Sequence, residues 1–290
     1  MKLKTIHILI VTFIATRLFL TGLPSLQIDM NSWQAWSARL TDVGPSNFYT
    51  PGYFADYFPG YLYLLWILGL IFKIFSSQIF SSEFAVTLKI ITNIFDIGTA
   101  FLIYKIVLKY NSSWAKPAGV FYLANPALIF NSSIWGQVDG ILTFFLVLSV
   151  YLLVEVKNLL FWSITTSIAI LIKPQALAIL PLIFVYMIRH FPLKKVVLAV
   201  IGILTLPILI SIPFFPQNPL FDLMNLFKNT AEGYKYTSLY AFNFWSIVGW
   251  WKSDIDLWFL TTHQIWGVFL YFISIFINTM GVFWFFKINM

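Results

Sequence analysis

Carboxylates are scarce in this chain, and most of those that could do chemistry gather in one polar stretch. Residues 27–59 hold Asp29, Asp42, Asp56 and the cation Arg39, whereas charged residues make up only 10% of the 290-residue chain. Eight aromatic side chains lie in the same stretch. We therefore take this stretch as the candidate centre of function, and the apolar segments around it as the elements that hold it in place.

Asp29 directly precedes an amphipathic pattern in which Trp33, Trp36 and Leu40 recur at helical spacing. A carboxylate at the start of such a helix is either an N-terminal cap or a general base held at a membrane edge. Asp56 begins the sequence Asp-Tyr-Phe-Pro-Gly, in which proline and glycine predict a turn. Capping of that turn is the alternative to a functional role for Asp56.

Two later polar segments contain further candidates. The sequence Trp135-Gly-Gln137-Val-Asp139 lies between two apolar runs, and we expect Gln137 and Asp139 to face one vestibule, although a polar helix turn is the alternative. Lys173, followed by Pro174 and Gln175, is either an ammonium that meets a phosphate or one that only extends to the interface.

Weaker candidates complete the set. Arg39 and Lys235 are positively charged and are therefore weaker candidates for the phosphate contact proposed for Lys173. Asp96, with Asn93 and Thr99 nearby, is expected to form hydrogen bonds between helices rather than to catalyse a reaction.

Composition identifies the class of protein that positions these groups. With 60% apolar and 20% aromatic residues, the chain is predicted to be an all-α polytopic membrane protein. No small-residue cleavage site follows the first apolar run, so we expect a retained anchor. The net charge of +7 forms no contiguous basic face and argues for topology rather than for nucleic acid.

The positive-inside rule then sets the topology. If residues 60–76 crossed the membrane, Lys105, Lys109 and Lys116 would lie outside, so we place this segment in the outer interface. Both termini are then cytoplasmic, and nine of the 11 acidic residues lie at the outer side. We treat the chain as a single domain, residues 1–290, with outer loops at about 23–83 and 213–257. The eight predicted spans cover residues 5–22, 84–109, 117–134, 139–156, 159–172, 174–190, 195–213 and 258–286.

Other chemistries lack their motifs. There is no glycine-rich phosphate loop and no dinucleotide fingerprint. The three histidines, His7, His190 and His263, are scattered, so we predict no metal cluster. Asp29 and Asp56 could in principle share a divalent cation, but no ligand spacing argues for it. An activated donor is therefore expected to come from the membrane itself.

The order of these motifs resembles that of the GT-C glycosyltransferases, and most closely of prokaryotic proteins related to the PIG-V-type mannosyltransferase of GPI-anchor synthesis. The resemblance covers about residues 5–250. It rests on five segments: Asp29, Asp56-Tyr57-Phe58-Pro59, Trp135-Gly136-Gln137-Val138-Asp139, Lys173-Pro174-Gln175 and Phe242-Asn243-Phe244-Trp245. Phe58 replaces the first proline of the family's D-Y-P-P pattern, and relatives often continue with further spans.

The resemblance implies a bundle with interfacial helices in the first outer loop and a polyprenyl-phosphate sugar as donor. It implies transfer of a hexose, such as mannose, to a glycan, lipid or protein acceptor on the extracytoplasmic face of the cell membrane. Asp29 would be the general base of an inverting reaction, and Lys173 would meet the lipid phosphate. The implied substrate-binding residues are Arg39, Asp56, Trp135, Gln137, Asp139, Gln175, Lys235 and Asn243.

Two other classes of function stay open. A carrier or flippase for a polyprenyl-linked sugar needs polar groups through the membrane depth, where the sequence places Asp96 almost alone. A non-catalytic subunit of an envelope-assembly complex also fits the composition. Activity of the purified chain separates these alternatives from an enzyme.

Overall fold

The computed structural model describes residues 3–75, 77–239, 241 and 243–288, with 282–288 described by backbone alone. Ser76, at the end of the expected interfacial segment, and Phe242, in the last motif, lie outside the described residues. The chain divides into two compact units, Met1–Ala176 with Val197–Leu223, and Leu177–Val196 with Met224–Met290.

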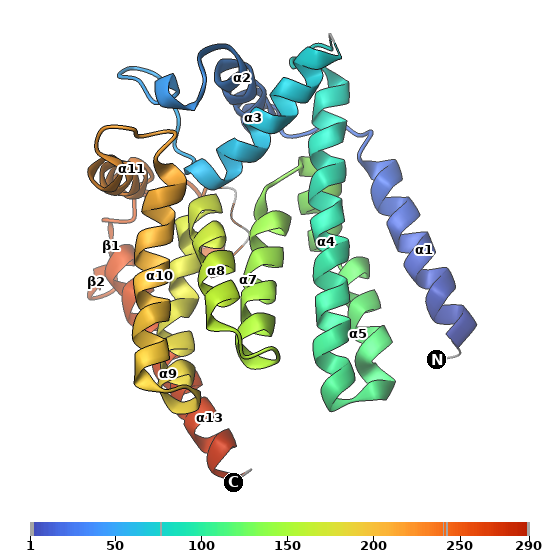
Figure 1. The fold of residues 1–290 in the computed structure, drawn as a ribbon, viewed down its shortest axis with the longest axis vertical. Coiled ribbons are helices and arrows are strands. Elements are labelled where there is room, and N and C mark those ends of the chain that lie inside the picture. Colours follow the sequence, from blue (N-terminus) through green and yellow to red (C-terminus); the bar gives the residue numbers. More distant parts are fainter. Residues whose placement is uncertain (1–2, 76, 240, 242, 289–290) are drawn as a thin grey trace. The chain divides into compact units, whose positions relative to one another are not determined.

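The described residues are mostly helical, as predicted (Figure 1). The first unit contains α1 (Leu3–Leu20), α2 (Gln27–Val43), the 3-10 turn η1 (Pro45–Asn47), α3 (Pro59–Ile74), α4 (Ser82–Tyr110), α5 (Ser112–Ala124), α6 (Pro126–Ile129), the π-helical η2 (Phe130–Trp135), α7 (Asp139–Val154), α8 (Leu159–Ile172) and most of α10 (Leu193–Ser211). The second contains α9 (Leu180–His190), most of α11 (Pro219–Gly233), α12 (Phe244–Val248), β1 (Leu257–Trp258), β2 (Thr261–Thr262) and α13 (His263–Ile288). The 3-10 turn η3 (Pro174–Ile179) crosses the boundary between the units.

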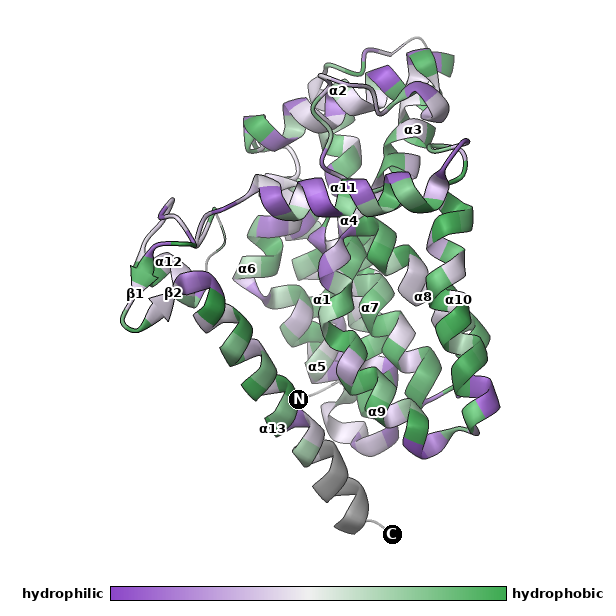
Figure 2. Ribbon diagram, turned by 90° about the vertical axis from the view of Figure 1, so that its left-hand side faces the viewer, coloured by the Kyte–Doolittle hydropathy of each residue, from purple (hydrophilic) through white to green (hydrophobic). Residues whose placement is uncertain are grey.

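Helix length and composition support a membrane protein. In the described part of the chain, three helices are long and apolar enough to cross a bilayer: α4, α10 and α13. Figure 2 shows α10 and α13 as mainly hydrophobic. On α10, Val197, Ile201 and Leu204 form an outward stripe, each 48–63% exposed. An exposed apolar stripe on so long a helix is suited to lipid contact.

The expected span at residues 117–134 is not one continuous helix. Its apolar run is divided into α5, α6 and η2. The break is at Asn125-Pro126, where the side chain of Asn125 caps the next turn by accepting a hydrogen bond from Ala127 N at 2.9 Å. Pro126 has no N–H with which to continue the ladder from α5. The prediction of a single helix here is therefore wrong.

Helices α2 and α3 pack against each other at one end of the first unit, where α3 lies obliquely to α4 (Figure 1). Gly69 makes the contact close, since a Cβ there would lie 2.3 Å from Thr41 Oγ1 and 2.6 Å from Ser37 Oγ. Ser37 Oγ also donates a hydrogen bond to Leu65 O at 2.8 Å. The interfacial placement of α3 stays a prediction, and its 16 residues are fewer than the roughly 20 that a span requires.

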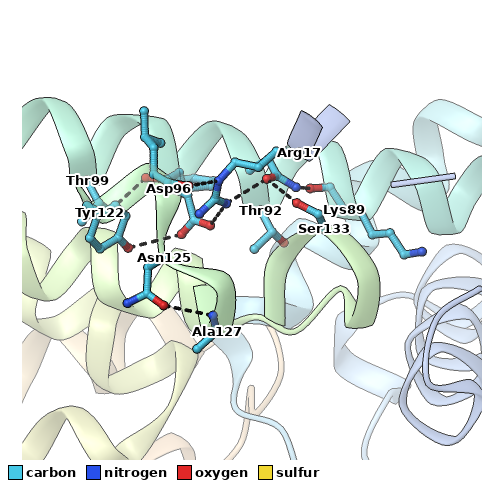
Figure 3. A network of polar contacts seen from close by, with 12 residues as sticks. Arg17, Lys89, Thr92, Asp96, Thr99, Tyr122, Asn125, Ala127 and Ser133 are labelled. Atoms are coloured by element: carbon cyan, nitrogen blue, oxygen red, sulfur yellow. Dashed lines mark hydrogen bonds and ion pairs between the residues drawn. The ribbon is translucent and has the colours of Figure 1, made fainter. Parts of the chain in front are cut away.

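A buried ion pair links α1 to α4 (Figure 3). The guanidinium of Arg17 lies 2.7 Å from Asp96 Oδ2, and the side chains are 1% and 0% exposed. Tyr122 OH on α5 also donates to Asp96, at 3.3 Å. A Cβ at Gly140 would lie 2.8 Å from Asp96 Oδ1, so this glycine lets α7 approach α4. The expectation that Asp96 bonds between helices is confirmed.

The second unit contains elements that the sequence reading missed. Residues 213–257 were expected to form a loop, but they include α11 and α12. The expected span at 258–286 begins instead with the β1–β2 hairpin, and α13 starts at His263. The ring of His263 stacks on Trp258, and Trp266 Nε1 donates to Trp258 O at 3.0 Å. These aromatic contacts hold the hairpin on the first turn of α13.

The ion pair gives a test of this packing. We expect Arg17→Met to lower the free energy of unfolding by about 3–5 kcal/mol, because it leaves the Asp96 carboxylate buried without a cation. Reversible unfolding in detergent measures the loss. The control is Lys73→Met, since Lys73 pairs with Asp42 at 3.6 Å where both side chains are more than 60% exposed. Equal effects of the two substitutions would contradict a stabilising role for the buried pair.

Candidate active site

Asp29 lies in the first turn of α2, but it does not cap the helix. The cap position is occupied by Leu26, which makes no side-chain cap. The carboxylate of Asp29 is half-buried, and its Oδ2 accepts hydrogen bonds from Trp135 Nε1 at 2.8 Å and Gln137 Nε2 at 2.6 Å. The capping alternative for Asp29 is therefore wrong. The structure brings together three of the predicted site residues.

The turn that carries these two donors depends on glycine. Gly136 ends η2 with a φ of 87°, and its N–H and that of Gln137 both donate to Asn131 O, at 3.0 and 2.9 Å. A Cβ at Gly136 would also approach Lys89 Cγ to 3.1 Å and Met30 Cε to 3.3 Å. Positive φ and close neighbours together favour glycine. The turn directs the side chains of Trp135 and Gln137 to the same carboxylate oxygen.

A second charged pair lies where α7 begins and α8 ends. Lys173 Nζ donates to Asp139 Oδ1 at 2.5 Å, and the side chains are 21% and 44% exposed. Asp139 is in the first turn of α7, whereas Lys173 is the C-cap of α8. Each charge therefore lies at the helix end whose dipole favours it. The structure gives Lys173 a carboxylate partner that the sequence reading did not predict.

Aromatic rings connect the two charged groups. The Lys173 ammonium lies 5.9 Å from the ring centre of Tyr57, whose ring is 5.5 Å from that of Tyr61. Tyr61 is buried, packs edge-on against Trp33 at 5.9 Å, and is close enough to Asp29 to interact with its charge. These tyrosines were not among the predicted site residues. Their signal was present in the sequence, where Tyr57 follows Asp56 directly and Tyr61 follows four residues later.

Arg39 supports the loop that leads to Asp56. Its guanidinium donates to Phe48 O at 2.9 Å, to Asn47 O at 3.1 Å and to Thr50 Oγ1 at 2.8 Å. It also lies 4.1 Å from the ring centre of Tyr53. These contacts give Arg39 a role within its own loop. The expectation that it binds substrate stays a prediction.

Asp56 is half-buried and does not cap α3, whose cap residue is Phe58. Its charge acts on the neighbouring phenol of Tyr49, whose pKa is raised by burial and further by Asp56. Tyr49 is therefore protonated at neutral pH and donates to Tyr57 O at 2.5 Å. This bond fixes the segment between Asp56 and α3. A substrate role for Asp56 stays a prediction.

The other predicted residues have simpler surroundings. Gln175 is exposed in the turn after Lys173. Lys235 and Asn243 belong to the second unit, where both are exposed, and Asn243 Oδ1 caps α12 by accepting from Trp245 N at 3.0 Å. Among the residues that the structure describes, no group of three or more His, Asp or Glu is placed to hold a metal ion.

Comparisons with known proteins found no relative of this chain. No protein-family model matches the chain, no curated protein matches it, and no solved structure matches it. The resemblance to the GT-C glycosyltransferases therefore rests on the sequence motifs alone.

Close backbone packing at Gly60 tests how Lys173 is positioned. A Cβ at Gly60 would lie 2.6 Å from Leu171 C and 2.8 Å from Ile172 N, in the last turn of α8. Backbone atoms cannot rotate away, so we expect Gly60→Ala to separate α3 from α8. The free energy of unfolding should fall by about 1–3 kcal/mol, as measured in detergent.

The control for this substitution is Gly233→Ala, at the end of α11, where a Cβ meets nothing within 4 Å. It should leave stability nearly unchanged. A Gly60→Ala protein as stable as Gly233→Ala would show that α3 does not pack against α8 in this way.

Proposed function

We propose that this protein is a membrane glycosyltransferase that moves a hexose, such as mannose, from a polyprenyl-phosphate donor to an acceptor hydroxyl. The transfer would take place on the extracytoplasmic face of the cell membrane. The observation that carries the proposal is the Asp29 carboxylate, half-buried and held through one oxygen by Trp135 and Gln137. A cation, Lys173, lies two tyrosine rings away.

Asp29 is suited to act as the base. Both hydrogen bonds end on Oδ2, and within the described residues Oδ1 accepts none. Oδ1 would take the proton of the acceptor hydroxyl as its oxygen attacks the anomeric carbon. The bond from that carbon to the phosphate oxygen breaks in the same displacement, which inverts the anomeric configuration. Trp135 and Gln137 would keep the carboxylate aimed throughout.

Lys173 is suited to the leaving phosphate. Its ammonium has three N–H donors, of which Asp139 takes one. The others would meet the phosphate as its negative charge grows, which stabilises the leaving group. Partial exposure of both side chains leaves a lipid phosphate access to this pair. Asp139 would position Lys173, and Tyr57 would cover it.

A carrier for a lipid-linked sugar is the second candidate. Arg17, Asn93 and Tyr122 bond to one another or to Asp96, the carboxylate that the sequence analysis placed almost alone in mid-membrane. This network bears on the carrier reading, which needs polar groups at that depth. Its charges, however, are paired internally, which favours a structural role over a path for a sugar.

The enzyme proposal predicts that Asp29→Asn lowers the rate of transfer by about a hundred- to ten-thousand-fold, because the amide cannot accept the acceptor's proton. Purified protein in lipid would be given radiolabelled polyprenyl-phosphate mannose and an acceptor extract. The matched control is Asp42→Asn on the same helix, where the side chain is 71% exposed. This variant should transfer at the wild-type rate.

Full activity in Asp29→Asn would exclude Asp29 as the base. If the wild-type protein forms no glycosidic product but moves the labelled lipid between leaflets, the chain is a carrier. If it does neither with any polyprenyl-phosphate hexose, the result favours a non-catalytic subunit of a larger complex.

A further inference from the structure

A cavity of about 520 Å³ lies in the first unit, outside the candidate active site. Its walls are the turn after α1, which comprises residues 22–25, the first two turns of α2, and the start of α4. Lys89 of α4 is part of the lining. None of the residues assigned above to catalysis or to phosphate binding lines it.

Lys89 is a buried cation without a carboxylate partner. The residue is 1% exposed, and its ammonium donates to Leu23 O at 2.5 Å and to Thr21 O at 3.2 Å. Among the described residues, no Asp or Glu oxygen lies within 4.0 Å of its nitrogen. A buried charge compensated only by neutral carbonyl groups is costly. An anion in the cavity would offset that cost.

The buried carboxylate of Asp96 is paired with Arg17 and not with Lys89. Arg17 and Lys89 are two buried cations near one end of α1, and Asp96 is the acidic residue buried beside them. Arg17 pairs with Asp96 at 2.7 Å. Figure 3 shows the Lys89 amine directed away from that pair. One positive charge is left over, on a residue that lines the cavity.

The rest of the lining is neutral and rich in hydrogen-bonding groups. Ser25 Oγ is buried and has no partner among the described residues. The remaining polar residues of the wall carry amides or hydroxyls, and none is acidic: Gln27, Asn31, Gln34, Ser81 and Ser82. Several neutral donors around one ammonium fit an anion with several acceptor oxygens.

We propose that this cavity binds the phosphate group of a phosphate ester. The Lys89 ammonium would pair with the phosphate, Ser25 Oγ would donate to one of its oxygens, and the amides of Asn31 and Gln34 would contact the esterified alcohol. The cavity volume leaves room for that alcohol. Both a soluble phosphate ester and a lipid headgroup have this chemistry.

The cavity also borders the turn that holds Asp29. Met30 and Lys89 line the cavity, and both contact the position of a Cβ on Gly136. An occupied cavity would therefore fix the side chains that pack against this turn. The binding proposal does not depend on glycosyl transfer, because binding is measured directly.

Melting temperature in neutral detergent tests the proposal. The soluble probes are inorganic phosphate and glycerol 3-phosphate. The lipid probe is short-chain phosphatidylglycerol, with the matching diacylglycerol as its phosphate-free control. We expect at least one phosphate probe to raise the melting temperature in a saturable way. A rise with the soluble probes identifies a soluble ester, and a rise with phosphatidylglycerol alone identifies a lipid headgroup.

Two variants locate the binding. Lys89→Gln should raise the dissociation constant for phosphate at least about tenfold, which is the loss of affinity typical when a charged hydrogen bond is removed. Asn31→Trp fills the cavity from an exposed position on α2, so it should abolish the rise even if Lys89→Gln fails to fold. Lys73→Gln removes an exposed lysine and should bind like the wild type.

The proposal is overturned if no phosphate probe raises the melting temperature. It is also overturned if Asn31→Trp binds as tightly as the wild type, or if diacylglycerol protects as well as phosphatidylglycerol does.

Discussion

The buried contact between Arg17 and Asp96 is the interaction on which the arrangement of the first unit depends. Removing either partner would leave the other charge buried and unpaired, which is costly, so this contact fixes α1 against α4. Arg17 also donates to Asn93 Oδ1, which accepts in turn from Ser133 Oγ in η2. The π-helical segment is thereby fastened to α4 just before it reaches the turn whose side chains hold Asp29. A buried polar network between α1, α4, α5 and η2 thus helps to position the Asp29 carboxylate.

Short helices and small residues complete this positioning. Helices α7 and α8 have 16 and 14 residues, or about 24 and 21 Å, less than the roughly 30 Å of a bilayer core. Asp139 and Lys173 lie at the end that these two helices share. Gly60 brings α3 against the last turn of α8. Gly136 likewise has no side chain, which leaves room for the side chain of Lys89, a residue that lines the cavity.

Sequence reasoning could find the residues of the site but not all of their partners. Asp29, Gln137 and Lys173 stood out because polar groups are rare in so apolar a chain. The predicted spans at 139–156 and 159–172 placed Asp139 and Lys173 at the same end, but residue types do not reveal which side chains meet there. Pro126 inside an apolar run was a sequence signal for the break at Asn125-Pro126. The hydrophobicity of the run alone nevertheless favoured one span. Lys89 was overlooked because an isolated lysine in such a run resembles a topology signal.

The anomeric configuration of the transferred sugar tests the central claim most directly. A single displacement with Asp29 as base places no covalent sugar intermediate on the protein, so the product must have the configuration opposite to that of the donor. The one-bond carbon–hydrogen coupling at the anomeric centre of the product, measured by NMR with a donor of known configuration, distinguishes the two outcomes. Inversion is the predicted result. Retention would require a double displacement or a substitution on the same face of the sugar, and would contradict the role given to Asp29.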